Sequence, residues 1–220
     1  MKTSRLSNFS SLIYKKRHLL KCVFSTLLFQ ACVTTLVVYY LNKEKVINLE
    51  NYNLLFSFMI LIVFILLIFG IIVVKSFRMK FILFTLFSIT QGVFLSLITR
   101  YLSDEVIMSA LFSTISIFIL FIIFGIITVY FRINLSWIGI ILFLFLLFMI
   151  VLNIVSIFIP QTEEQKKKIT ILGIMLFSSY IAYDTNSLLL KDYNMDCIMG
   201  ALNYYIDLIN LFTDIVRYDN

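Results

Sequence analysis

The chain alternates between long apolar stretches and short polar segments. Because a helix needs about 20 apolar residues to cross the hydrocarbon core of a bilayer, each of these stretches is long enough to span it. The pattern predicts seven transmembrane helices, at residues 19–41, 52–74, 81–101, 106–131, 135–159, 169–190 and 197–217. An all-α membrane protein follows, with a single polytopic domain between a basic N-terminal segment and a short tail, at residues 19–217, 1–18 and 218–220.

The last of these stretches differs from the others because polar side chains interrupt it. An Asp near the centre of a helix costs roughly 2.5–3.5 kcal/mol on insertion into a membrane, so this segment needs polar neighbours to insert. A re-entrant segment after six spans is therefore the structural alternative. The polar residues are Asn203, Asp207, Asn210 and Asp214.

Composition and charge support the membrane assignment and indicate an orientation. Hydrophobic residues make up 61% of the chain and charged residues 14%, which excludes a water-soluble globule. The net charge of +6 is spread between apolar runs, so no nucleic-acid-binding surface is expected. Eleven of the 18 Lys and Arg residues fall on the side of the N-terminus, which predicts that the N-terminus is cytosolic. The lysine-rich loop at 160–168 is the exception to this charge bias.

Few residue types suited to catalysis are present, and no enzyme is predicted. There is one His, so metal clusters and His-based triads are not expected. The cysteines at 22, 32 and 197 form no CxxC pair and are interpreted as packing residues. A membrane aspartyl protease would use two aspartates, but the glycine typical beside its catalytic aspartate is missing.

Three of the chain's 12 acidic residues, Asp184, Asp207 and Asp214, lie at membrane depth, where ionisable groups usually serve a function. Asn203, Asp207, Asn210 and Asp214 recur at steps of four, three and four, which places them on one helical face. For the two asparagines we favour an interhelical hydrogen-bond seam. For the acids we favour a functional role.

Asp184 and Asp207 are predicted to meet. Asp184 precedes Lys191 by seven residues and Asp207 follows Asp196 by eleven, so the two acids lie roughly 10 Å and 16 Å from a shared loop at 1.5 Å per residue. Two carboxylates in contact in a low-dielectric site would share a proton. Once both are charged they repel each other and become oxygen ligands suited to Ca²⁺, which links proton loss to opening and cation entry.

Two segments of the sequence resemble a known family. The string AYDTNSLLLKDYNMDCIMGALNYYIDLINLF near the C-terminus and the segment 90–118 are similar to the transmembrane Bax inhibitor motif family, whose pattern places YDT at the end of the sixth helix and LDIINLF in the seventh. The resemblance covers about 200 residues. The start of the first span, with Gln30 and Thr34, and the terminal NLFTDIVR resemble the Golgi anti-apoptotic protein branch, which viruses also carry.

This resemblance implies the Bax inhibitor motif fold in Golgi or endoplasmic reticulum membranes, with a pH-dependent Ca²⁺ leak that restrains cell death. It implies that Asp184 and Asp207 form a proton-sharing pair that gates the leak, with Ca²⁺ passing transiently between them. Further pore-lining candidates are Asn203, Asn210, Asp214, Asp196 and Gln91. The base that pairs with the aspartates in some relatives is not evident, and Tyr183, Asn203 or a helix-end base is expected to replace it.

Two other functions are weighed against the leak channel. A proton-coupled cation exchanger would also use intramembrane acids, as relays. A non-conducting anti-apoptotic scaffold would use them to assemble helices. The partners expected in either case are membrane lipid, Ca²⁺, protons, and further copies of the chain or other apoptosis-regulating membrane proteins. No cofactor is expected, and Ca²⁺ enters only as the permeant ion.

Overall fold

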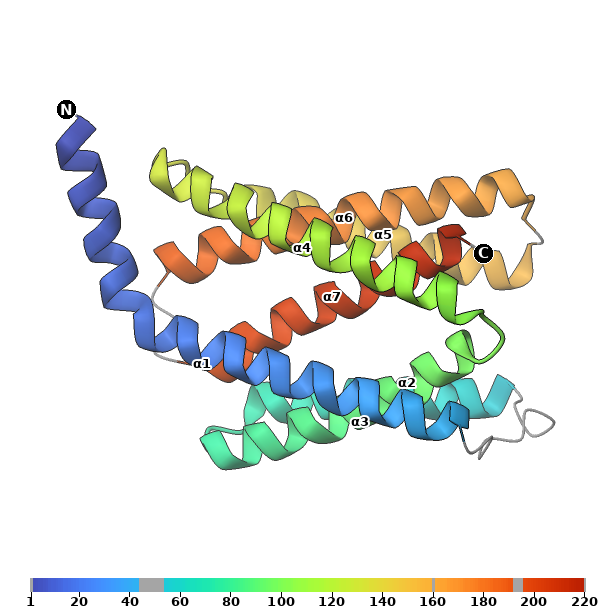
Figure 1. Ribbon diagram of the computed structural model, residues 1–220. Coiled ribbons are helices and arrows are strands. Elements are labelled where there is room, and N and C mark those ends of the chain that lie inside the picture. The colour runs from blue at the N-terminus through green and yellow to red at the C-terminus, as the bar shows by residue number, and fades with distance from the viewer. Residues whose placement is uncertain (1, 44–53, 160, 192–195, 220) are drawn as a thin grey trace. The chain divides into compact units, whose positions relative to one another are not determined.

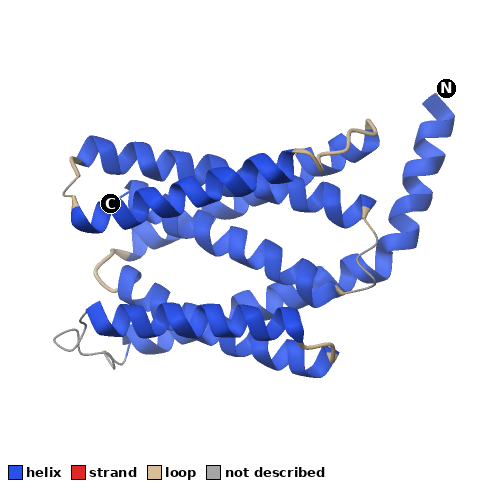
Figure 2. Ribbon diagram, turned by 180° about the vertical axis from the view of Figure 1, so that it is seen from behind, coloured by secondary structure: helices blue, strands red, loops and turns tan. Residues whose placement is uncertain are grey.

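The computed structural model describes residues 2–43, 54–159, 161–191 and 196–219. In these ranges the chain forms seven α-helices and no strand (Figures 1 and 2), which confirms the predicted fold class. The helices are α1 (Lys2–Lys43), α2 (Leu54–Val73), α3 (Phe77–Thr99), α4 (Asp104–Tyr130), α5 (Ile138–Phe158), α6 (Glu163–Leu190) and α7 (Cys197–Asp219).

Several helices extend into the polar segments that flank the predicted spans. Helix α6 begins six residues before its span because Thr162 and Gln165 form a capping box, with Thr162 Oγ1 accepting from the Gln165 backbone N–H at 3.3 Å. Helix α4 begins after Ser103, whose hydroxyl accepts from the Val106 N–H at 3.4 Å. Helix α7 is one uninterrupted helix of 23 residues and not a hairpin.

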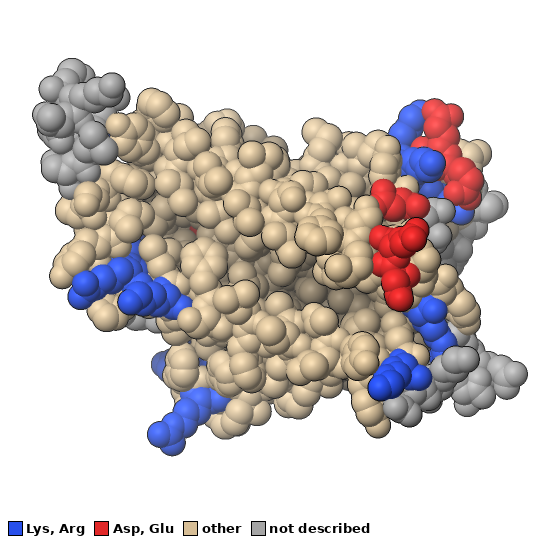
Figure 3. All heavy atoms as spheres, in the orientation of Figure 1, with Lys and Arg blue, Asp and Glu red and all other residues tan. Residues whose placement is uncertain are grey.

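The described helices carry the apolar surface that lipid requires. Four segments are long and apolar enough to cross a membrane, and a shorter apolar helix lies at Met59–Val73. Large side chains such as Phe112 on α4 and Leu144 on α5 are exposed over more than half of their surface, at 66% and 59%. On the face shown in Figure 3, charged side chains form a few separate groups with uncharged surface between them. The chain is thus a multi-pass membrane protein. The four long apolar segments are Phe9–Lys43, Phe77–Thr99, Asp104–Tyr130 and Ile138–Ser156.

The contacts between helices divide the chain into two compact units. The first unit comprises Met1–His18, Ser103–Met195 and Ile206–Asn220, and the second comprises Leu19–Leu102 and Asp196–Tyr205. In the first unit α6 packs against both α4 and α5, and in the second α2 packs against α3. Helices α1 and α7 each contribute one part to each unit.

Close packing in the first unit depends on glycines that face α6. A Cβ atom added at Gly125 of α4 would lie 2.6 Å from the Thr185 Cβ and 2.7 Å from the Ala182 carbonyl oxygen. A Cβ atom added at Gly139 of α5 would lie 2.6 Å from the Tyr183 hydroxyl. Since a small residue allows two backbones to approach, these glycines set the distance of α4 and α5 from α6.

A buried asparagine fixes the connection between α4 and α5. Asn186 of α6 is 1% exposed, and its amide nitrogen donates to Thr128 Oγ1 and to the Ile133 carbonyl oxygen, both at 2.8 Å. Its Oδ1 accepts from the Leu135 backbone N–H at 3.1 Å. Helix α4 ends just before this connection, where Arg132 adopts a left-handed backbone conformation with φ of 61°. Asn186 therefore holds the connection in place while satisfying its own polar atoms.

Two of the three cysteines are covalently joined. Cys22 of α1 and Cys197 at the start of α7 form a disulfide within the second unit, whereas Cys32 is free and exposed. The interpretation of Cys22 and Cys197 as packing residues is therefore wrong. The two cysteines are 175 residues apart, and only the folded chain brings their Cα atoms to 5.8 Å, within the usual range for a disulfide.

Candidate functional site

The two aspartates that the sequence paired both lie inside the first unit. Asp184, near the end of α6, is 7% exposed, and Asp207, in the middle of α7, is 5% exposed. Their carboxyl groups lie close enough to repel each other when both are charged. Two buried like charges are costly in a low-dielectric interior, so this arrangement favours a state in which at least one of the two acids holds a proton.

One oxygen of the pair accepts no hydrogen bond from the described residues. Asp207 Oδ2 is buried there without a hydrogen-bond partner. A buried polar atom left in this state costs about 1–3 kcal/mol, and more when the group is charged. Such an oxygen is a suitable acceptor for a proton, a water molecule or a cation.

A tyrosine lies within electrostatic range of both acids. Tyr180 lies one helical turn before Asp184, on the same face of α6, and its phenol interacts electrostatically with both Asp184 and Asp207. The sequence analysis did not single out Tyr180. The four-residue spacing from Asp184 was the available signal, but tyrosines are common in this chain and the spacing alone does not distinguish one from a packing residue.

Lys191, which follows the last residue of α6, is a base that acts on the aspartate pair. Lys191 attracts the Asp184 carboxylate electrostatically, and its Nζ donates to the Tyr183 hydroxyl at 3.2 Å. No direct ion pair joins Lys191 to Asp184 in the described part of the chain, so the base acts on the acid by longer-range attraction. A helix-end base and Tyr183 were both among the expected substitutes.

Asp214, the third intramembrane acid, has a basic partner of its own. Its Oδ1 lies 3.8 Å from Nη1 of Arg217, one turn later on α7. Its carboxylate packs against Gly173 of α6, where an added Cβ atom would collide with it. Glycine at this position therefore makes room for an acid between α6 and α7.

The remaining candidates differ in their surroundings. Asn203 and Asn210 are half-buried on the face of α7 that carries Asp207. Asp196 and Gln91 belong to the second unit. There, Asp196 forms an ion pair with Lys80 and accepts from the Met199 backbone N–H at 3.2 Å, so its carboxylate holds the start of α7.

The second unit also contains a group of buried polar residues that the sequence analysis largely missed. Thr34 of α1 donates to the Ser88 carbonyl oxygen at 3.1 Å and shares a 2.5 Å hydrogen bond with the Tyr205 hydroxyl. Gln30 Nε2 donates to Thr85 Oγ1 at 3.1 Å. The four-residue spacing of Gln30 and Thr34 in the first span indicates that the two side chains share one face of the helix. It does not identify the residues on other helices that they contact.

Comparison with known proteins identifies the family of the chain. Residues 16–218 match the family model described as "Inhibitor of apoptosis-promoting Bax1". The chain belongs to this Bax inhibitor family. The match begins within α1, ends one residue before the end of α7, and includes both aspartates of the buried pair.

Two relatives have the same sequence identity to this Bax inhibitor family member over matches of different length. Bax inhibitor 1 of Schizosaccharomyces pombe is 27% identical over 203 residues, which cover 90% of this chain and 74% of the yeast protein. The Golgi anti-apoptotic protein of Vaccinia virus (strain Lister) is 27% identical over 131 residues, which cover 60% of this chain and 54% of the viral protein. The comparisons thus establish the family and do not single out one branch of it.

Proposed function

We propose that the protein is a pH-sensitive, Ca²⁺-permeable leak channel, gated by the Asp184 and Asp207 pair. The observation that carries the proposal is the burial of two interacting carboxyl groups on adjacent helices, with Asp207 Oδ2 unpartnered. With a proton shared between them, the acids attract and hold α6 and α7 together. When both are charged they repel, and their oxygens become hard ligands of the kind that Ca²⁺ prefers.

The proposed biological role is to lower the Ca²⁺ content of intracellular stores and so restrain apoptosis. The names of the two relatives, a Bax inhibitor and a Golgi anti-apoptotic protein, support this role and a location in Golgi or endoplasmic reticulum membranes. We further propose that the chain belongs to the Golgi branch and that its N-terminus is cytosolic, as the distribution of Lys and Arg favours.

Ca²⁺ flux into proteoliposomes at a series of pH values tests the proposal. The unsubstituted protein is expected to conduct more as the pH rises, because proton loss charges both acids. Asp184→Asn and Asp207→Asn should each remove most of this pH dependence, because an amide cannot release a proton in this range. Asp104→Asn, at an exposed acid in the first turn of α4, is the matched control and should behave like the parent. If both Asn variants conduct like the parent at every pH, the gating role is wrong.

The same preparation distinguishes the alternatives. A proton-coupled exchanger would move protons outward as Ca²⁺ enters, whereas a leak channel needs no proton counter-flux. The described parts of α6 and α7 are continuous helices, while many exchangers bind their ions at broken ones, which favours the channel. A scaffold predicts that folded variants without flux still protect cells from apoptosis.

A further inference from the structure

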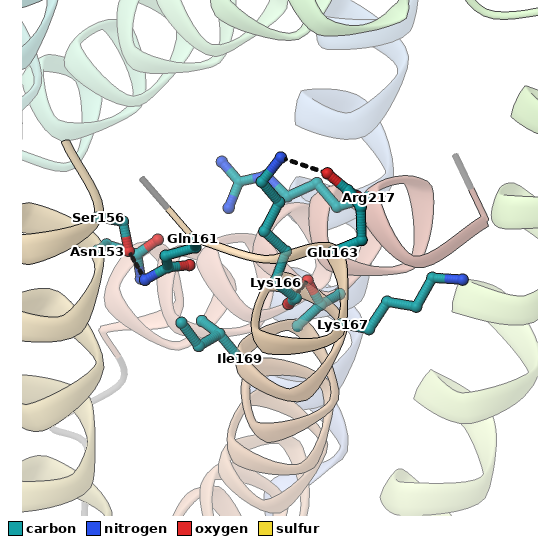
Figure 4. Close-up of a pocket in the computed structure, with 9 residues that line it drawn as sticks. Asn153, Ser156, Gln161, Glu163, Lys166, Lys167, Ile169 and Arg217 are labelled. Atoms are coloured by element: carbon teal, nitrogen blue, oxygen red, sulfur yellow. Dashed lines mark hydrogen bonds and ion pairs between the residues drawn. The ribbon is translucent and has the colours of Figure 1, made fainter. Parts of the chain in front are cut away.

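A polar cavity lies at the end of the first unit where α5 ends, α6 begins and α7 ends. Its volume is about 690 Å³, which lies in the range of small-molecule sites. Figure 4 shows that residues from all three helices and from the connection before α6 surround it. The lining comprises Asn153, Ser156, Gln161, Glu163, Lys166, Lys167, Ile169, Thr170 and Arg217.

The charge of this lining is predominantly positive. Three bases face one acid, Glu163, whose carboxylate accepts from Lys166 Nζ at 2.7 Å. This hydrogen bond and the charge of Lys166 lower the pKa of Glu163, so Glu163 neutralises Lys166. The 3.8 Å pair with Asp214 involves one nitrogen of the Arg217 guanidinium, a group with five N–H donors. Lys167 and Arg217 are thus the bases best able to bind an anion.

The depth of the cavity corresponds to the headgroup region of a membrane. Helix α5 is apolar almost to its last residue, Phe158, and the charged residues of α6 begin five residues later at Glu163. Lysines and arginines at such a boundary extend toward the lipid phosphates. Basic pockets between transmembrane helices are known to bind anionic headgroups.

A second, largely apolar cavity adjoins the first. It measures about 330 Å³ and shares Gln161 and Ile169 with the basic cavity. The rest of its lining is Leu152, Val155, Ile159, Gln165 and Lys168. The apolar cavity would add nothing to the binding of a soluble phosphate. A lipid, in contrast, carries an acyl chain next to its phosphate, and this chain could fill the apolar cavity.

We propose that the two cavities together form a binding site for one anionic phospholipid, with the phosphate between Lys167 and Arg217 and an acyl chain between α5 and α6. The guanidinium of Arg217 binds the phosphate through paired N–H donors, and Lys167 adds a positive charge. Asn153 and Ser156 supply neutral polar contacts to the headgroup. The two phosphate-binding bases are distinct from the Asp184 and Asp207 pair, although Arg217 also pairs with Asp214, and lipid binding is measured without cation conduction.

Lipid retention by the full-length protein tests the proposal. The protein is reconstituted in an equimolar mixture of phosphatidylcholine and phosphatidylglycerol, extracted into detergent, and examined by native mass spectrometry. The parent is expected to retain phosphatidylglycerol in preference to phosphatidylcholine. The double variant Lys167→Gln, Arg217→Gln should retain roughly thirtyfold less, as expected for the loss of two charges near a phosphate.

A matched control separates this site from general surface charge. The double variant Lys15→Gln, Lys21→Gln removes the same charge from exposed positions on α1 and should retain phosphatidylglycerol like the parent. Equal loss in the control, or parental retention in the Lys167 and Arg217 variant, would overturn the proposal. Arg217→Lys keeps the charge and should retain more lipid than Arg217→Gln. The exposed substitution Lys167→Glu tests the site without threatening the fold, and unchanged retention would count against it.

A soluble phosphate is examined in a separate experiment. Inorganic phosphate is added to the protein in phosphatidylcholine alone and its binding is measured by calorimetry. The lipid assignment expects weak or undetectable binding, because the apolar cavity then contributes nothing. Tight binding of inorganic phosphate together with no preference for phosphatidylglycerol would overturn it.

Discussion

At the scale of single residues, the acidic site is defined by its neighbours as much as by its carboxylates. Asp207 leaves one oxygen unpartnered, and Tyr180 is the polar side chain that the fold adds to the pair. A phenol can donate to a charged carboxylate, and such charge-assisted hydrogen bonds are stronger than neutral ones. Tyr180 is therefore expected to adjust the pH at which the site opens.

Substitution of Tyr180 by Phe tests this role. If the phenol stabilises the charged acids, Tyr180→Phe should move the half-maximal Ca²⁺ flux to a pH higher by about half a unit to one unit, since one pKa unit corresponds to about 1.4 kcal/mol. Flux titrations in proteoliposomes provide the measurement. Tyr130→Phe, at a tyrosine whose ring packs on Phe9, is the control and should leave the midpoint unchanged. A midpoint that stays at the parental pH would remove Tyr180 from the site.

At the scale of helices, small residues determine which helices can pack closely. Gly125 and Gly139 bring α4 and α5 against α6, and Gly173 accommodates the Asp214 carboxylate between α6 and α7. The helices α4 and α5 are apolar around most of their circumference, so their hydrophobic pattern does not say which side faces a neighbour. The glycines mark those sides, but only the structure shows which helix each one meets.

Gly125→Ala is expected to destabilise the first unit. The added methyl group would collide with the Thr185 Cβ and with the Ala182 carbonyl, neither of which can rotate away. Overpacking of this kind costs about 1–3 kcal/mol. Thermal unfolding in detergent should show a lower Tm for Gly125→Ala than for the parent.

Gly70→Ala is the matched control for that experiment. A Cβ atom there would lie 3.3 Å from the flexible end of the Leu83 side chain, which can move aside. Its Tm should stay near the parental value. Because Ala favours a helix more than Gly does, helix propensity does not lower the Tm of either variant, and equal losses of Tm in the two would show that the α4 and α6 contact does not govern the result.

At the scale of the whole molecule, contacts between residues far apart in the sequence define each compact unit. Lys80 with Asp196 and Cys22 with Cys197 both join the start of α7 to earlier helices of the second unit. In the first unit, Lys16 of α1 donates to the Lys191 carbonyl oxygen at 2.6 Å. The two parts of α1 are thus held by different sets of helices.

The cysteine pairing can be tested directly. In protein purified without reductant, peptide mapping should recover a crosslinked peptide that contains Cys22 and Cys197, and prior reduction should convert both to alkylated thiols. Cys32, which is free and exposed, should be alkylated under both conditions and serves as the internal control. Full alkylation of Cys22 and Cys197 in unreduced, folded protein would contradict the crosslink.

Hydropathy and helical periodicity by themselves determined the membrane class, the seven helices and the face of α7 that carries Asp207 and Asp214. These properties are local, because the length of an apolar stretch and the spacing of polar residues are fixed within one helix. The similar depth of Asp184 and Asp207 also follows from their distances to the segment that joins α6 and α7, and this similar depth is what predicts that the two acids meet.

Only the tertiary structure decided which side chains meet across helices that are distant in the sequence. It placed Tyr180 with the acid pair, Arg217 beside Asp214, and Cys22 against Cys197. The basic cavity likewise exists only where α5, α6 and α7 come together. Helices that are apolar on nearly every side can be rotated with little change in their pattern, so packing, glycine contacts and buried hydrogen bonds select the partners.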